Sequence, residues 1–166
     1  MPNQLESLPD GFKVDATDAR ILLELGRHPR ATTIAVADEV GIARNTAHAR
    51  LTRLERAGVI GAFERRVNPA ALGYPLTAFV TARVTQRRLD GVATALAAVP
   101  EVLQVHGLSG EIDLLIHVVA AGADDLYRIA GQVLAIPGVE RTNTALVMRE
   151  LVDYRLAPLL SRKASS

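Results

Sequence analysis

Apolar residues recur at helical spacing in the first third of the chain. Residues 16–27 carry the first apolar stripe, and Asp15 stands where its carboxylate can cap the first turn. Residues 33–40 carry the second stripe, with Thr32 or Thr33 in position to cap it. The pattern predicts two short helices near the N-terminus.

A third helical stretch follows a glycine. Gly41 permits a sharp turn, residues 44–57 continue with helical spacing, and Gly58 stands beyond their end as a C-cap. Two helices around a tight turn are typical of a helix-turn-helix, whose second helix enters the major groove of DNA. Residues 59–67 then predict a turn and a strand in the wing position of a winged helix.

The third helix is predicted to have an apolar inner face and a polar outer face. At about 100° per residue, Ala47, Leu51 and Leu54 share the inner face. The outer face offers amide, hydroxyl and guanidinium groups that can bind base edges and phosphates, although ordinary surface polarity is the alternative. The residues predicted to contact DNA are Thr32, Arg44, Asn45, Thr46, His48, Ala49, Arg50 and Arg53.

Positive charge is concentrated on this helix and the segment after it. The 166 residues carry 19 Lys and Arg against 18 Asp and Glu, a net charge of +1. Residues 44–66 hold six arginines and two glutamates, a local net charge of +4 that leaves −3 for the remainder. Arginine suits phosphate and guanine because its planar fork donates two hydrogen bonds at once. Arg50, at the flank of the apolar face, can reach a phosphate or a carboxylate. A solvated, arginine-rich face is the alternative.

The C-terminal half predicts a β-α-β unit that occurs twice. Residues 76–85 alternate like a strand, and a helical pattern, a proline and a second strand follow. The helical pattern, the proline and the strand return 37 residues later, so that Pro100 matches Pro137 and Val102 matches Val139. The two units meet in a hairpin around residues 109–113.

The resulting order β-α-β-β-α-β is the ferredoxin-like arrangement. We therefore expect an α+β protein in which an N-terminal winged helix-turn-helix precedes a ferredoxin-like domain, with two helices on one face of an antiparallel sheet. Val80, Ala82 and Val84 are expected to point to the other face, which then needs a cover. A second copy of the same sheet is the natural cover, so the pattern predicts a homodimer.

Composition narrows the classes of function. Hydrophobic residues make up 49% of the chain, enough for a real core, and the absence of cysteine excludes disulfide scaffolds, thiol catalysis and cysteine-based zinc sites. No apolar run approaches the roughly 18 residues of a membrane span. The first residues lack the pattern of a secretory signal, so we expect a cytoplasmic protein. No convergent acid, base or metal-binding set is visible, and we expect neither a cofactor nor a metal ion.

Two histidines form the one constellation of titratable groups with a possible role. His106 and His117 fall opposite each other if residues 109–113 centre the hairpin. Such a pair can bind a metal or sense pH. The alternative is two partly buried or interfacial histidines.

In order and spacing, the fragments of this chain resemble the Lrp/AsnC family of bacterial and archaeal transcription regulators, also called feast/famine regulators. The resemblance covers roughly residues 13–150, and each fragment alone is weak. The fragments are Asp15–Asp18, Ile21–Leu22, Ala37–Ile42, Thr46, Arg50–Leu54, Gly58–Ile60, Pro100–Val102, Ser109–Asp113, Pro137–Val139, Thr142 and Thr144.

The resemblance implies a winged helix-turn-helix, a linker strand and an effector domain that dimerises and often assembles into octamers. It also implies that a small molecule, commonly an amino acid, binds between effector domains. The implied boundaries are an N-terminal arm (1–14), a DNA-binding domain (15–61), a linker strand (62–75), an effector domain (76–150) and a C-terminal extension (151–166). The first ~12 residues and those after Asp153 fall outside the resemblance and are interpreted as flexible arms.

By the same resemblance, the turn at residues 109–113 is the ligand loop. Glycine permits a close approach of the backbone, and Asp113 can accept hydrogen bonds from an α-ammonium group. The alternative is that Gly110 and Asp113 only shape a hairpin turn. The candidate effector-binding residues are His106, Ser109, Gly110, Glu111, Asp113, Thr142 and Thr144.

Two positions depart from the family pattern. Ala43 stands where the family usually has Ser before the third helix, and the loss of that N-cap costs on the order of 1 kcal/mol. Ala47 replaces the Val that often follows Thr46.

We expect a sequence-specific, ligand-responsive regulator that binds a pseudo-palindromic DNA site. The alternatives are a weakly specific architectural DNA-binding protein of the same family and an enzyme on a ferredoxin-like fold.

Overall fold

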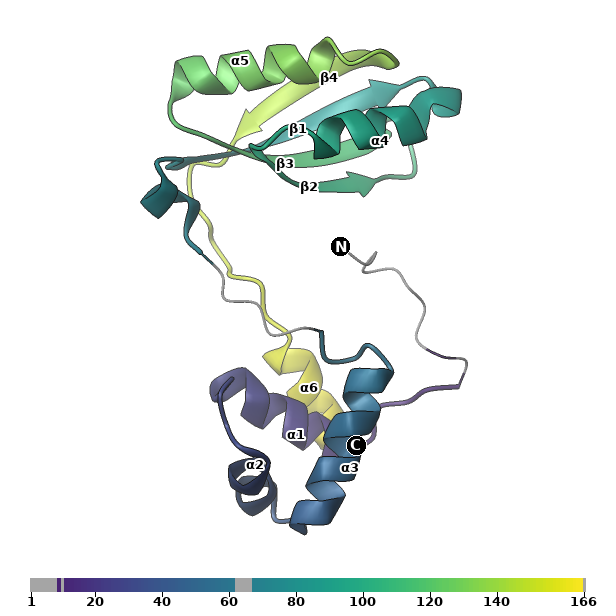
Figure 1. Cartoon of the computed structure of the whole chain (residues 1–166), viewed down its shortest axis with the longest axis vertical. Coiled ribbons are helices and arrows are strands. Elements are labelled where there is room, and N and C mark those ends of the chain that lie inside the picture. The colour runs from purple at the N-terminus through teal and green to yellow at the C-terminus, as the bar shows by residue number, and fades with distance from the viewer. Residues whose placement is uncertain (1–8, 10, 62–66, 166) are drawn as a thin grey trace. The chain divides into compact units, whose positions relative to one another are not determined.

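The computed structural model describes residues 9, 11–61 and 67–165. The chain divides into two compact units, drawn in Figure 1. The first unit, here called the DNA-binding unit, joins residues 1–64 with 152–166. The second, here called the effector unit, spans residues 65–151.

Three helices form the body of the DNA-binding unit: α1 (Ala16–Arg27), α2 (Thr33–Val40) and α3 (Arg44–Arg56). Ile21, Val36 and Leu54 form its core and are fully buried. Each helix begins and ends within a residue of the prediction, because the caps and breakers that set the ends are local. The Asp15 side chain accepts a hydrogen bond from the Asp18 N–H, and the Asp18 side chain accepts one from the Asp15 N–H, which makes a capping box.

The turn between α2 and α3 depends on Gly41, whose φ of 72° lies in the left-handed region. Thr32 caps α2 by accepting from the Ala35 N–H. Ala43, at the N-cap of α3, offers no side chain for this purpose, as the sequence predicted. The start of α3 therefore keeps backbone N–H groups without a side-chain partner.

A helix near the C-terminus belongs to the DNA-binding unit. Residues after Asp153, interpreted from the sequence as a flexible arm, instead form α6 (Ala157–Ala164), which packs against α1 (Figure 1). Leu160 and Ala164 are its partly buried residues. The segment forms a helix because its apolar side packs on α1. An apolar pattern over only eight residues is too short to predict such a helix from the sequence.

The predicted wing and linker strands do not appear in the described segments. Residues 59–61 form a bend without strand pairing, and residues 62–66 lie outside the described part of the chain. In residues 67–75, where the linker strand was expected, the structure has a 3₁₀ turn, η1 (Pro69–Leu72), capped by Asn68. Proline at its first position favours such a turn because it fixes φ and donates no backbone hydrogen bond.

The effector unit has the predicted ferredoxin-like arrangement. Its strands β1 (Leu76–Val84), β2 (Val102–Gly107), β3 (Leu114–Ala120) and β4 (Val139–Leu146) pair antiparallel in the order β2-β3-β1-β4. The helices α4 (Leu89–Ala97) and α5 (Ala123–Leu134) cover one face of the sheet, and the short turn η2 (Gln86–Arg88) leads into α4 (Figure 1). The repeat is visible in the core, where Val92, Leu96, Ile129 and Val133 are all fully buried.

The prediction for the two faces of β1 was wrong. Val80, Ala82 and Val84 belong to the core cluster with α4 and α5 and are buried. Since side chains alternate across a strand, the opposite face carries Phe79 and Arg83. Strand alternation identifies two faces but does not say which one the helices cover.

Among the residues that the structure describes, none of the helices has the length and apolar character of a membrane-spanning segment.

Candidate DNA-binding and ligand-binding sites

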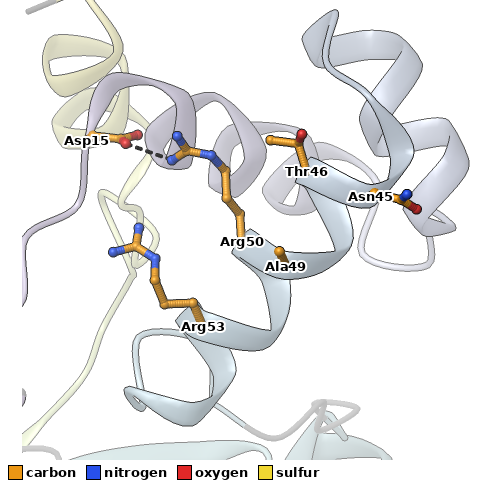
Figure 2. Close-up of a pocket in the computed structure, with 6 residues that line it drawn as sticks. All are labelled: Asp15, Asn45, Thr46, Ala49, Arg50 and Arg53. Carbon is orange, nitrogen blue, oxygen red and sulfur yellow. Dashed lines mark hydrogen bonds and ion pairs between the residues drawn. The ribbon is translucent and has the colours of Figure 1, made fainter.

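The outer face of α3 presents the residues that the sequence singled out for DNA. Figure 2 shows Asn45, Thr46, Ala49, Arg50 and Arg53 along one side of the helix. Of the predicted contacts, all are exposed on this helix except Arg50, which is partly buried, and Thr32, which is exposed but caps α2. Ala47 and Leu54 lie on the opposite face and are fully buried. The predicted inner and outer faces of the helix are therefore correct.

Arg50 joins α3 to the start of α1. Its Nη1 lies 2.6 Å from Oδ2 of Asp15 and 2.8 Å from Oδ1 of Asp18, and the dashed line in Figure 2 marks the first contact. The backbone N–H of Asp18 and, after it, the Arg50 guanidinium lower the pKa of Asp15 to about 2. Of the two partners that the sequence left open for Arg50, the structure provides carboxylates.

Asp18 is the functional position that sequence reasoning missed. Its carboxylate is fully buried and accepts hydrogen bonds from Arg50 and Arg53, as well as from the Asp15 N–H. A signal was available, because Asp18 shares the apolar stripe of α1 with Leu22. A carboxylate on a core-facing stripe requires a cationic partner.

Arg53 has two contacts within the unit and remains partly open to solvent. Its guanidinium binds Asp18 and lies 4.8 Å from the centre of the Phe12 ring, a cation–π contact. The Arg53 side chain is nevertheless 43% exposed. Because a guanidinium carries five N–H donors, several remain for an outside acceptor such as a phosphate. The network thus fixes the orientation of α3 and holds Arg53 in place at its surface.

The predicted ligand loop is organised around Asp113. The Asp113 carboxylate accepts a hydrogen bond of 2.8 Å from the Val84 N–H, and the Asp113 N–H donates to the Ala82 carbonyl. Gly110 has a φ of 124°, which only glycine adopts readily. The Asp113 carboxylate therefore already ties the loop to the end of β1.

Two of the seven candidate effector residues line one groove of the effector unit. Glu111 and Thr142 lie in a groove of about 400 Å³, at the end of the sheet where β1 and the edge strand β4 meet the ligand loop. Ser109, Gly110 and Asp113 belong to the same loop but do not line the groove. The complete lining is Thr81, Ala82, Arg83, Glu111, Ile112, Arg141, Thr142 and Asn143.

His106 and Thr144 lie away from this groove. His106 is on the other edge strand, β2, paired with Leu115. Thr144 pairs with the buried residue Val80, on the side of the sheet that faces the helices. The sequence order of these residues could not show that they are separated by the width of the sheet.

The predicted pairing of His106 with His117 was wrong in register. His117 pairs with Gln104 and His106 with Leu115, because the turn joins the paired residues Gly107 and Leu114 and sets a register displaced from the predicted one. His117 stacks on Phe79 at 5.0 Å between ring centres. Burial lowers the pKa of His117, and the charge of His106 lowers it further. Among the described residues, no group of three or more His, Cys, Asp or Glu side chains could hold a metal ion.

Comparisons with known proteins match both units. Residues 14–60 match the family model for a winged helix-turn-helix DNA-binding domain, and residues 77–157 match the model for the Lrp/AsnC ligand-binding domain. The HTH-type transcriptional regulator FL11 of Pyrococcus horikoshii is 30% identical over 82% of this chain and 90% of its own length. The HTH-type transcriptional regulator AldR of Mycolicibacterium smegmatis is 34% identical over 83% of each chain.

Solved structures share the fold of this chain. A feast or famine regulatory protein from M. tuberculosis, complexed with L-methionine, is 26% identical, with a TM-score of 0.77 over 87% of this chain and 98% of that one. AsnC of E. coli, at 22% identity, shares the fold with a TM-score of 0.80 over 89% and 100% of the two chains. FL11 and AldR are both named as HTH-type transcriptional regulators, not as enzymes. The chain belongs to the Lrp/AsnC family of transcription regulators, with a helix-turn-helix for DNA and a separate domain for a ligand.

Proposed function

We propose that the protein is a sequence-specific regulator whose α3 reads the major groove. The observation that carries this proposal is the buried carboxylate of Asp18, which binds Arg50 and Arg53 from α3 and fixes the helix against α1. A rigid helix presents Asn45 and Thr46 to base edges at low entropic cost. An asparagine amide matches the donor and acceptor pattern of adenine, and the Ala49 methyl can contact a thymine methyl.

The charge of this surface favours a specific regulator over an architectural DNA-binding protein. A weakly specific binder relies on free cations that contact phosphates. Arg50 is tied to Asp15 and Asp18, and Arg53 is partly neutralised by Asp18. Contacts to bases and the symmetry of the assembly then contribute more of the selectivity.

We further propose that the effector unit binds an amino acid or a related metabolite between subunits of a homodimer or octamer. The M. tuberculosis relative, complexed with L-methionine, supports an amino acid. The sheet face away from α4 and α5 carries Phe79, Leu115 and His117, an apolar centre that a second sheet would cover. A twofold dimer requires a pseudo-palindromic site. We propose the cytoplasm as the place where the protein acts.

Selection of bound sequences from random DNA tests whether the protein binds DNA in a sequence-specific way. We expect enrichment of a palindrome with half-sites about one helical turn apart, roughly 10 base pairs. Equal affinity for unrelated DNA, with a steep dependence on salt, would instead establish the architectural function. Sedimentation of the free protein reports whether it is a dimer or a larger assembly.

Single substitutions then test the helix. Asn45→Ala should reduce specific affinity by about 1–3 kcal/mol, the value of one bidentate base contact, and leave non-specific affinity unchanged. Asn45 is the better choice over Arg53, because replacing Arg53 also removes the bond to Asp18. Glu55→Ala is the matched control, since Glu55 is exposed on α3 but does not belong to the surface formed by Asn45, Thr46, Ala49, Arg50 and Arg53.

A further inference from the structure

Two arginines face each other in the groove of the effector unit. Arg83 of β1 and Arg141 of β4 are direct partners in the antiparallel ladder, and both are exposed. Like charges at directly opposed positions destabilise a strand pair. Neither guanidinium has a hydrogen bond or an ion pair to another described residue. This arrangement stores repulsion that an anion would relieve.

One carboxylate lines the same groove. Glu111 comes from the ligand loop, and its side chain has no polar partner among the residues that the structure describes. Two other carboxylates of the effector unit have partners elsewhere. The Asp113 carboxylate accepts from the Val84 N–H, and the Glu140 carboxylate accepts from the Thr85 hydroxyl. Within one subunit, the groove therefore offers two cations and a single anion.

The count of charges selects among amino acids. A neutral amino acid carries one carboxylate and one ammonium group, so it would satisfy Glu111 and leave one of the two arginines unpaired. An amino acid with an acidic side chain carries two carboxylates and one ammonium group, which matches Arg83, Arg141 and Glu111. Arginine binds carboxylates with two parallel hydrogen bonds, which adds geometric selectivity.

We propose that this groove binds an acidic amino acid, either aspartate or glutamate. Its two carboxylates bind Arg83 and Arg141, and its ammonium group binds Glu111. The groove, at about 400 Å³, falls within the range of roughly 300–1,000 Å³ that small-molecule sites occupy. The inference rests on the proposed function of the effector unit as an amino-acid sensor, and it adds the chemical class of the ligand.

Calorimetric titration of the full chain with L-glutamate, L-aspartate, L-glutamine, L-methionine and 2-oxoglutarate tests the proposal. An acidic amino acid should bind at least about 10-fold more tightly than glutamine, because the amide loses a charge-assisted pair. The compound 2-oxoglutarate keeps both carboxylates but lacks the ammonium group. It should therefore bind more weakly than glutamate. The substitution Glu111→Gln should reduce the difference in affinity between glutamate and 2-oxoglutarate.

Substitution of the arginines locates the site. Arg83→Gln and Arg141→Gln should each weaken binding of the acidic amino acid about 10-fold or more. Glutamine needs only the arginine that binds its α-carboxylate, so one of the two variants should leave glutamine binding unchanged. Arg87→Gln, an exposed arginine of η2 outside the groove, is the matched control and should change nothing. DNA binding without ligand should be equal in all variants, which verifies their folding.

The possible failures are distinguishable. Tighter binding of glutamine or methionine, unaffected by the arginine variants, overturns the acidic ligand but leaves an amino-acid sensor in place. Binding of glutamate that neither arginine variant weakens overturns the assignment of the groove. Absence of binding by every compound overturns both the inference and the proposed amino-acid effector.

Discussion

Replacing the buried Asp18 by asparagine should destabilise the DNA-binding unit more than a conservative change at any exposed position of the unit. The carboxylate is fully buried and accepts through both oxygens, from Arg50 at Oδ1 and from Arg53 and the Asp15 N–H at Oδ2. Asparagine has nearly the same shape but places an NH₂ donor where one oxygen stood. That donor then faces other donors, and the compensating negative charge is lost.

The structure bounds the size of the effect. Breaking a fully buried ion pair costs about 3–5 kcal/mol, because the remaining charge has no partner. Arg53 is 43% exposed and can be solvated, and Arg50 is 28% exposed and keeps Asp15. We therefore expect a loss of about 2–3 kcal/mol, below the fully buried value. For a unit of this size the loss lowers Tm by roughly 10–20 °C.

Thermal unfolding followed by circular dichroism measures the change, and hydrogen exchange assigns it to a unit. Peptides from α1 and α3 should exchange faster in Asp18→Asn, whereas peptides from β1 and β3 should not change. Asp38→Asn is the matched control, since Asp38 is exposed on α2 and its side chain has no polar partner among the described residues. A loss under about 0.5 kcal/mol, equal to that of the control, would refute the reasoning, because surface changes fall in this range.

Three further outcomes follow from other parts of the structure. A carboxyl with a depressed pKa stabilises the fold above its ordinary pKa, so the contribution of Asp15, whose pKa is about 2, should be lost as pH falls from about 4 to 2. Urea midpoints against pH should record this loss, and Asp15→Asn should flatten it. Gly138→Ala should cost about 1–3 kcal/mol, because φ is 108° and a new Cβ would lie 2.8 Å from the Arg88 Cβ. Gly131→Ala in α5, with nothing within 4 Å of its Cβ, should instead stabilise by about 0.5–1 kcal/mol in the same urea assay, and equal effects at the two glycines would contradict the argument. Removal of residues 153–166 deletes α6, which packs against α1. The loss of the partly buried Leu160 should cost about 1 kcal/mol and lower the Tm of the DNA-binding unit by roughly 4–8 °C. An unchanged Tm would mean that α6 adds no stability.

The sequence by itself determined the three N-terminal helices and the double β-α-β unit, but neither α6 nor the turn η1 that stands where a linker strand was predicted. Helix ends followed from Asp15 and Gly41, and the double β-α-β unit followed from an internal repeat whose apolar positions became the core. These signals are local or periodic, so they depend on neighbours three or four residues away and not on the rest of the fold. The inner and outer faces of α3 and the ferredoxin-like order could be predicted for the same reason.

Tertiary structure alone decided which of these residues meet. Asp18 and Arg53 are 35 residues apart in the chain, and nothing local indicates that one neutralises the other. Arg83 and Arg141 became partners only through the pairing of β1 with β4. The register of β2 against β3 depends on where the turn between Gly107 and Leu114 begins and ends, and a shift of one residue exchanges the two faces of a strand. Strand pairing and burial bring together positions that are distant in the sequence, and they depend on the packing of the whole unit. Contacts between charged side chains were therefore decided by the tertiary structure and not by the local sequence pattern.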